Sequence, residues 1–218
     1  MLVDYKTPAD LPAALPVFPL SGALLLPRVL LPLNIFEPRY LDMISDAMSS
    51  HRLIGMIQPD AQPDYGKAGL QTVGCAGRIT AYSETEDGRL LITLSGISRF
   101  HITEELDVTT PYRQVRTSFD AYANDLVEGY GDTDVNRDRL VSLLRQYLDA
   151  NDMQGDWEAI QQSSTEELVN SLSVVSPYGP QEKQALLEAE TLANRADILI
   201  AMTEMVLAQS GQENTRLQ

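Results

Sequence analysis

The chain has 218 residues, of which 44% are hydrophobic, and a formal net charge of −15 at pH 7. This length suits one large domain or two small ones, and the normal apolar content excludes a disordered or fibrous chain. The acidic balance disfavours nucleic acid as a partner, because phosphate binding needs a basic patch. The single cysteine, Cys75, excludes an internal disulfide or a multi-cysteine metal site, and we expect a buried apolar residue.

Targeting signals are missing from the sequence pattern. The N-terminus has no basic-then-apolar signal, and the most apolar stretch, residues 13–33, contains four prolines that disfavour a membrane-spanning helix. We therefore expect a soluble, cytoplasmic protein with no membrane partner.

Composition divides the chain into two halves. Nine of the 12 prolines lie in residues 8–63. Residues 1–123 carry ten basic and 14 acidic residues, whereas residues 124–218 carry six and 17. The predicted organisation is a β-rich unit over 1–123, a linker over 124–134, a helical unit over 135–210 and a flexible tail over 211–218.

Strand patterns dominate the first half. Residues 15–20 form an apolar run whose prolines suit a sheet edge or a strand end, and residues 53–57 form another apolar run. Apolar and polar residues alternate in 78–82, 90–95 and 115–119. Together with the turn signal Glu86-Asp87-Gly88, this spacing predicts a closed or strongly coiled antiparallel sheet.

Helix signals occur once in the first half of the chain and throughout the second half. Pro38 suits the first position of a helix that would bury Tyr40 and Ile44. About four helices are predicted in the second half. Their expected boundaries are Asp134 as the cap of a helix over 135–149, Ser164 with Glu167 as a capping box, Pro177 as a stop, Pro180 and Thr191 as starts, and Gly211 as the end.

Catalytic and metal-binding patterns are not found in the sequence. It has no P-loop, dinucleotide fingerprint, serine-hydrolase elbow, zinc motif or calcium loop. Of the two histidines, His51 is predicted at a helix end facing carbonyl groups and His101 on a sheet face. We therefore predict no catalytic residue, no metal site and no cofactor.

A series of short motifs is more specific in its order than any motif alone. The motifs are Leu15-Pro16-Val17-Phe18-Pro19-Leu20, Leu31 to Tyr40, Val73 to Ile79, Gly96-Ile97-Ser98-Arg99-Phe100, Pro111-Tyr112, and Lys183 to Glu188 followed by Arg195. This series resembles the LON domain, the N-terminal substrate-binding domain of Lon-type ATP-dependent proteases. Two positions depart from the pattern: Arg28 stands where the family often has glycine, and Cys75 where it often has threonine.

The resemblance implies an α+β fold, with a PUA-like antiparallel β pseudo-barrel and one inserted helix, followed by an α-helical bundle. It implies a stand-alone bacterial LON-domain protein without ATPase or protease domains, which binds polypeptide segments or a partner protein in a groove between barrel and bundle. Two alternatives remain. One is an RNA-binding module, because PUA-like folds resemble such modules, although the net charge of −15 disfavours it. The other is an unrecognised hydrolase.

The corner formed by Phe36, Glu37, Arg39 and Tyr40 has two interpretations. As a structural corner, Phe36 packs, Glu37 favours the positive end of the helix, and Arg39 pairs with a carboxylate or carbonyl group. As a functional surface, the arginine and the aromatic residues would form a recognition site between the barrel and its helix.

Overall fold

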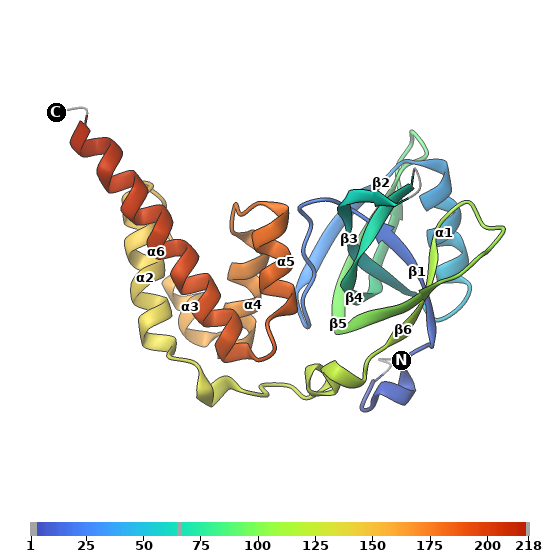
Figure 1. The fold of residues 1–218 in the computed structure, drawn as a ribbon, viewed down its shortest axis with the longest axis horizontal. Helices are drawn as coiled ribbons and strands as arrows, with labels where there is room; N and C mark the ends of the chain where they lie inside the picture. The colour runs from blue at the N-terminus through green and yellow to red at the C-terminus, as the bar shows by residue number, and fades with distance from the viewer. Residues whose placement is uncertain (1–3, 65–66, 217–218) are drawn as a thin grey trace.

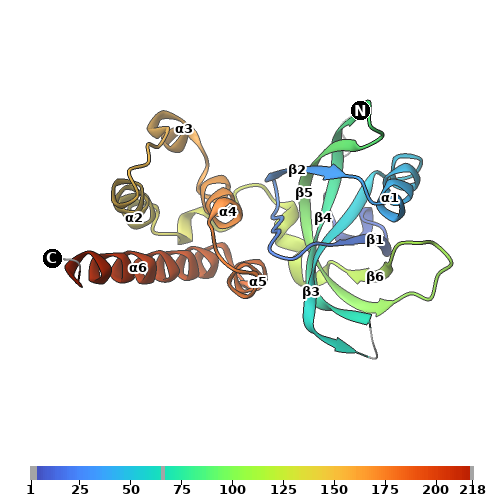
Figure 2. The ribbon, with the colours of Figure 1, turned by 90° about the horizontal axis from the view of Figure 1, so that it is seen from above.

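The computed structural model describes residues 4–64 and 67–216. A barrel and a helical bundle lie side by side, joined by a long connector (Figure 1, Figure 2). The first half contains η1 (Pro8–Asp10), β1 (Ala14–Pro19), β2 (Leu30–Ile35), α1 (Pro38–Met48), β3 (Leu53–Asp64), β4 (Lys67–Glu84), β5 (Leu90–Glu105) and β6 (Gln114–Ser118). The connector holds η2 (Asp120–Leu126) and η3 (Asp132–Asp134). The bundle consists of α2 (Arg137–Ala150), α3 (Trp157–Gln162), α4 (Thr165–Val175), α5 (Pro180–Glu188) and α6 (Leu192–Arg216).

The sheet closes on itself through β5. The strand order is β2-β5-β4-β3-β1-β6, and β5 also pairs with β6. The first part of β5 pairs with β2 and its last part with β6. The prediction of an antiparallel sheet is wrong for one pair, because β1 runs parallel to β3. The segment between these two strands contains β2 and α1, which supplies the long crossover that a parallel pair requires.

Of the two places that suit the prolines of β1, the strand end holds, since Pro19 is its last residue, whereas the sheet edge does not, since β1 pairs on both sides. Residues Ala14 to Pro16 pair with β6, and Val17 to Pro19 pair with β3. Each neighbour thus pairs with only half of β1. Part of each edge therefore needs no amide donor and tolerates proline.

The hairpin and the inserted helix form as predicted. Gly88 has a φ of 78° in the turn between β4 and β5, a conformation that suits glycine. Helix α1 begins at Pro38 and buries Tyr40, Met43 and Ile44 against the barrel. It lies on the side of the barrel that faces away from the bundle (Figure 2).

Gly96 of β5 lies against the loop that precedes β2. Its N–H donates to the carbonyl of Val29, and its own carbonyl accepts from the N–H of Arg28, both at 2.9 Å. A Cβ atom at this position would overlap the backbone carbonyl of Leu26. The chain therefore needs glycine here because two backbone segments touch.

We expect Gly96→Ala to lower the free energy of unfolding by about 2–3 kcal/mol, since the loop must move to admit a methyl group. Urea denaturation measures this loss. Gly22→Ala is the matched control: Gly22 has a φ of 74° and no atom within 4 Å of its Cβ position. The control isolates the backbone cost of about 1 kcal/mol. A smaller loss for Gly96→Ala than for the control would contradict the steric argument.

The bundle has five helices, one more than the predicted four. The additional short helix, α3, is capped by the Asp156 side chain. The predicted capping box of Ser164 and Glu167 is confirmed. Helix α2 begins later than predicted, because the Asn136 side chain accepts from the N–H of Arg139 and Asp134 lies in η3 instead.

The C-terminal helix also differs from its prediction at one end. It begins directly after Thr191, whose hydroxyl accepts from the N–H of Asn194. It continues through Gly211 to Arg216, because a single glycine weakens a helix without ending it. Residues 217–218 of the predicted tail lie outside the described residues.

One apolar core runs from the barrel into the bundle, and a second lies inside the barrel around Phe100. Cys75 is 1% exposed, which confirms the expected buried apolar role. Burial raises the pKa of its thiol far above the ordinary value. The larger core joins the two halves and so helps to set how they sit together.

Candidate functional site

Arg99 of β5 joins the barrel to the bundle. Its Nε and Nη2 donate to the two carboxylate oxygens of Asp125 at 2.9 and 2.8 Å. Its Nη1 donates to the carbonyls of Leu187 and Ala189 at 3.1 and 2.6 Å. The guanidinium also lies 4.2 Å from the centre of the Tyr122 ring. Since Arg99 and Asp125 are both buried, this is a desolvated ion pair whose remaining donors are satisfied.

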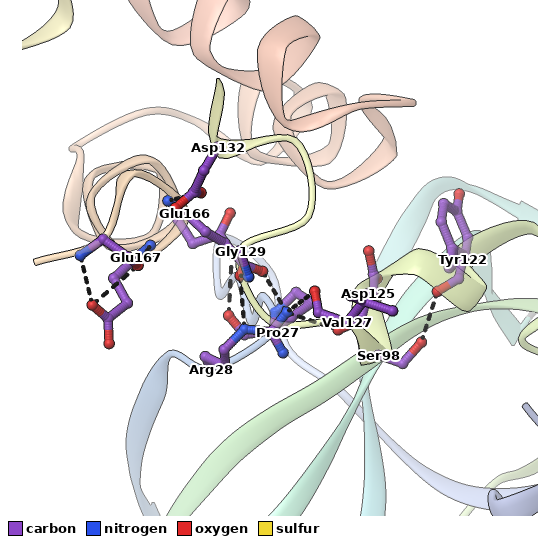
Figure 3. Close-up of polar contacts among 12 residues, drawn as sticks. Pro27, Arg28, Ser98, Tyr122, Asp125, Val127, Gly129, Asp132, Glu166 and Glu167 are labelled. Atoms are coloured by element: carbon purple, nitrogen blue, oxygen red, sulfur yellow. Dashed lines mark hydrogen bonds and ion pairs between the residues drawn. The ribbon is translucent and has the colours of Figure 1, made fainter. Parts of the chain in front are cut away.

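Arg28 forms a second link, from the loop before β2. Its Nε and Nη2 donate to the Glu166 carboxylate at 2.8 and 2.7 Å, and Nη2 also donates to the carbonyls of Asp125 and Val127 (Figure 3). The N–H of Gly129 completes the set by donating to Glu166 at 2.9 Å. The φ of Arg28 is 65°, a glycine-like conformation. A glycine-like backbone at this position thus carries a side chain that holds the connector and α4.

Amide side chains form the third link. Gln58 of β3 donates to the carbonyl of Pro180 at 2.9 Å and to the Gln184 side chain at 3.2 Å. Gln184 donates in turn to the carbonyl of Val73 in β4. On the other side, Asn170 of α4 donates to the carbonyl of Pro27 at 3.2 Å. The side chains described at the junction bind one another, which favours a fixed joint over an open groove.

The predicted corner separates into two parts. Tyr40 is buried against Phe18, with ring centroids 4.4 Å apart. Arg39 pairs with Glu37 at 2.8 Å and lies over the Tyr40 ring. Glu37 is the N-cap residue of α1, but its side chain makes no capping hydrogen bond. The prediction that Phe36 packs inward is wrong, since Phe36 is 61% exposed.

Phe36 directly follows β2 and belongs instead to a group of exposed apolar residues on and beside this strand. Alternation along β2 turns Leu30, Pro32 and Asn34 to the same outer side. Pairing with β5 places Leu91 opposite Asn34, between Pro32 and Phe36. Leu30 is 61% exposed and Leu91 is 46% exposed. We call Leu30, Pro32, Phe36 and Leu91 the β2 outer face.

The β2 outer face adjoins a hollow and an unpaired strand edge. A cavity of about 450 Å³ is lined by residues of β2, β4 and β5, including the exposed Tyr82. Among the described residues, β2 pairs with β5 alone. Single exposed apolar residues are ordinary, but a group of them at an edge strand marks an interaction surface.

Both histidines make contacts with neighbouring residues of the barrel and the connector. The N–H of Leu53 donates to Nδ1 of His51 at 3.1 Å, so the predicted contact of His51 with carbonyls is wrong. Burial and the nearby Arg78 lower the pKa of His51, which favours the neutral ring. His101 of β5 stacks on Tyr122 at 5.1 Å. Across the described residues, no group of three or more His, Cys, Asp or Glu could hold a metal ion.

The described helices also lack membrane-spanning character. None of them combines the length and the apolar content that crossing a bilayer requires.

The order of strands, inserted helix and bundle matches one known family. A family profile described as "ATP-dependent protease La (LON) substrate-binding domain" matches residues 14–204. The chain belongs to this family. The match covers both the barrel and most of the bundle, so the LON substrate-binding domain includes both halves described above.

Relatives and solved structures agree with this assignment. A Lon protease of Desulfosudis oleivorans is 32% identical over 115 residues, which are 50% of this chain and 14% of that protein. A Lon protease of Heliobacterium modesticaldum is 24% identical over 199 residues, which are 85% of this chain and 23% of that protein. The chain thus spans less than a quarter of the length of these relatives.

Two solved structures are similar in fold. The N-terminal domain of a Mycobacterium avium complex Lon protease superimposes with a TM-score of 0.64 at 17% identity, covering 88% of this chain and 98% of that one. A Lon N-terminal domain protein from Xanthomonas campestris gives a TM-score of 0.59 at 20% identity, covering 86% and 97%. At these identities the likeness concerns the fold.

The Gly-x-x-Arg-Phe motif of this LON substrate-binding domain now has a physical meaning. Gly96 allows the close approach of the loop, Arg99 reaches Asp125 and the bundle, and Phe100 fills the second core. Sequence reasoning recognised the motif but missed its partner Asp125. It also missed Leu30 and Leu91 as exposed residues, although the alternation along β2 and β5 carried that signal.

Proposed function

We propose that this LON substrate-binding domain is a non-catalytic module that binds extended polypeptide segments on the β2 outer face. The observation that carries the proposal is the group of exposed apolar residues at the edge strand β2, with Leu30 and Pro32 on the strand, Phe36 directly after it and Leu91 on the neighbouring β5. The family's description as substrate-binding supports a binding role over a catalytic one. The proposal includes residence in the cytoplasm and the division into 1–123, a 124–134 linker and 135–210.

The physical basis is the combination of strand edge and apolar side chains. The edge of β2 offers backbone groups to an incoming strand, and alternate side chains of that strand can rest on Phe36 and Leu91. Pro32 removes one donor from the edge, which limits uncontrolled pairing between copies of the domain. Arg89 lies over the Phe36 ring at 5.7 Å and holds it at the surface. Nucleic acid is not proposed, because the net charge of −15 opposes phosphate binding.

We expect Leu91→Lys and Phe36→Ala each to weaken binding of reduced, carboxymethylated α-lactalbumin, a permanently unfolded protein, by about tenfold. The reason is that each change removes apolar area from the centre of the proposed surface. Fluorescence anisotropy with the labelled client measures the affinity. Val108→Lys is the matched control, because Val108 is 37% exposed but lies outside this surface. Equal losses for all three variants, or no binding by the unaltered domain, would exclude the β2 outer face.

A further inference from the structure

The bundle contains an apolar groove that the β2 outer face does not explain. Helix α2, the end of α4 with the loop after it, and α6 line a cavity of about 350 Å³. Its walls include Leu144, Tyr147, Leu172, Val175, Tyr178 and Leu199. Figure 2 shows α2 beside α6, with α4 across from them. We call this cavity the bundle groove. Its size lies in the range of ordinary ligand sites, and it takes apolar groups.

Negative potential surrounds the bundle groove. Two helices end at it: α2 at Ala150, next to Leu148 and Met153, and α4 at Val175. A helix C-terminus carries partial negative charge, and neither helix has a basic residue in its own last turn. Lys183 of α5 donates to the carbonyl of Val174 at the end of α4, so the uncompensated end is that of α2. Asp149 and Asp152 follow Leu148 at the end of α2. In the described part of the chain, neither carboxylate has an ion-pair partner.

Five cations of the bundle, all those whose side chains the structure describes, are already engaged. Arg139 pairs with Glu204, Arg145 lies over the Trp157 ring, and Lys183 donates to the carbonyl of Val174. The remaining two, Arg137 and Arg195, donate to the carbonyls of Ile160 and Leu186 respectively. None of these described cations pairs with Asp149 or Asp152 at the end of α2. The groove therefore combines an apolar floor with an acidic rim.

We propose that the bundle groove binds the apolar face of a basic amphipathic helix. Leucine-like side chains at i, i+3 and i+4 would enter the cavity, while lysine or arginine residues would face Asp149, Asp152 and the end of α2. A second copy of this chain fits poorly, because it would bring like charge against like charge. Anionic lipid is disfavoured for the same reason. The inference rests on the proposed function only in that this domain binds polypeptides.

The test uses two helical peptides of about 18 residues with leucine at i, i+3, i+4 and i+7, one carrying lysine on its polar face and the other glutamate. Fluorescence anisotropy with the full chain should give at least about tenfold tighter binding for the lysine peptide, weakening as salt increases. Two measurements on each variant without added peptide, the circular dichroism spectrum and the thermal unfolding midpoint, show whether the fold is kept.

Variants locate the site. Val175→Lys should weaken binding of the lysine peptide at least about tenfold, because Val175 lines the groove. Its side chain is 72% exposed, so the substitution should not disturb the fold. Met205→Lys is the matched control, since Met205 is 65% exposed on α6 outside the groove lining; less than a twofold change is expected, about the scatter of a surface substitution. Asp149→Asn with Asp152→Asn should weaken binding about threefold to fivefold. Asparagine at 152 keeps the φ of 53° accessible.

The outcomes separate the two proposals. If Leu91→Lys weakens binding of the lysine peptide and Val175→Lys does not, the groove proposal is overturned and the β2 outer face proposal stands. Retained groove binding without any binding of unfolded α-lactalbumin overturns the β2 outer face and leaves the groove standing. Equal binding of the lysine and glutamate peptides, or binding of neither, overturns the inference.

Discussion

Replacing Asp125 by alanine is expected to lower the free energy of unfolding by about 3–5 kcal/mol. The change leaves the guanidinium of Arg99 buried without its carboxylate, and Arg99 is only 4% exposed. It also removes the acceptor of the Arg99 backbone N–H. Desolvation of an unpaired charge is the dominant cost, and it exceeds the loss of the hydrogen bonds themselves. Urea denaturation followed by circular dichroism measures the effect.

A double variant separates charge burial from lost packing. Arg99→Met with Asp125→Leu removes both charges and keeps apolar volume, so it should lose less stability than Asp125→Ala alone. A double variant as unstable as the single variant would show that the hydrogen bonds to Leu187 and Ala189, and not the unpaired charge, hold the junction. In that case the ion pair would not be the main stabilising contact between barrel and bundle.

Arg28→Ala is expected to destabilise the protein by about 2–4 kcal/mol. Glu166 is 6% exposed, so it would keep a buried carboxylate whose remaining donor is the N–H of Gly129. The positive φ adds nothing to this loss, because arginine already carries the cost of about 1 kcal/mol that alanine would carry. The same denaturation experiment measures this loss.

Two further variants assign the parts of this effect. Arg28→Gly removes the same side chain but accepts a φ of 65°, so it should be about 1 kcal/mol more stable than Arg28→Ala. Arg28→Ala with Glu166→Gln removes the unpaired charge and should recover part of the loss. If Arg28→Gly were as stable as the unaltered protein, the hydrogen bonds and ion pair of Arg28 would contribute no more than the roughly 1 kcal/mol of backbone strain that glycine relieves.

Local signals in the sequence predicted the local structure. Pro38 at the start of α1, the Asp87-Gly88 turn and the Ser164–Glu167 capping box each involve residues within four positions of one another. Such interactions form from the nearest neighbours, so a single sequence shows them. The wrong prediction of Asp134 as the cap of α2 also has a physical reason. Aspartate and asparagine cap helices equally well, and Asp134 lies in η3, so Asn136 caps α2 instead.

Surface and site were harder to predict than fold class. The LON motifs indicated barrel and bundle, and the family match over residues 14–204 confirms the family. The role of the corner residues stays a proposal. Phe36 was expected to pack, yet strand alternation continues one residue beyond β2 and turns it outward. The bundle groove needed three helices to be placed together, and no window of sequence contains all three walls.

By itself, the sequence determined the division into a β-rich and a helical half, and it placed most of the negative charge in the second half. The net charges are −4 over residues 1–123 and −11 over residues 124–218. It could not determine that some of this charge lies beside the bundle groove. Only the tertiary structure decided that Arg28 meets Glu166, 138 positions away, and that β1 lies parallel to β3. The physical reason is that caps and turns depend on neighbours along the chain, whereas ion pairs, strand partners and grooves depend on packing in space.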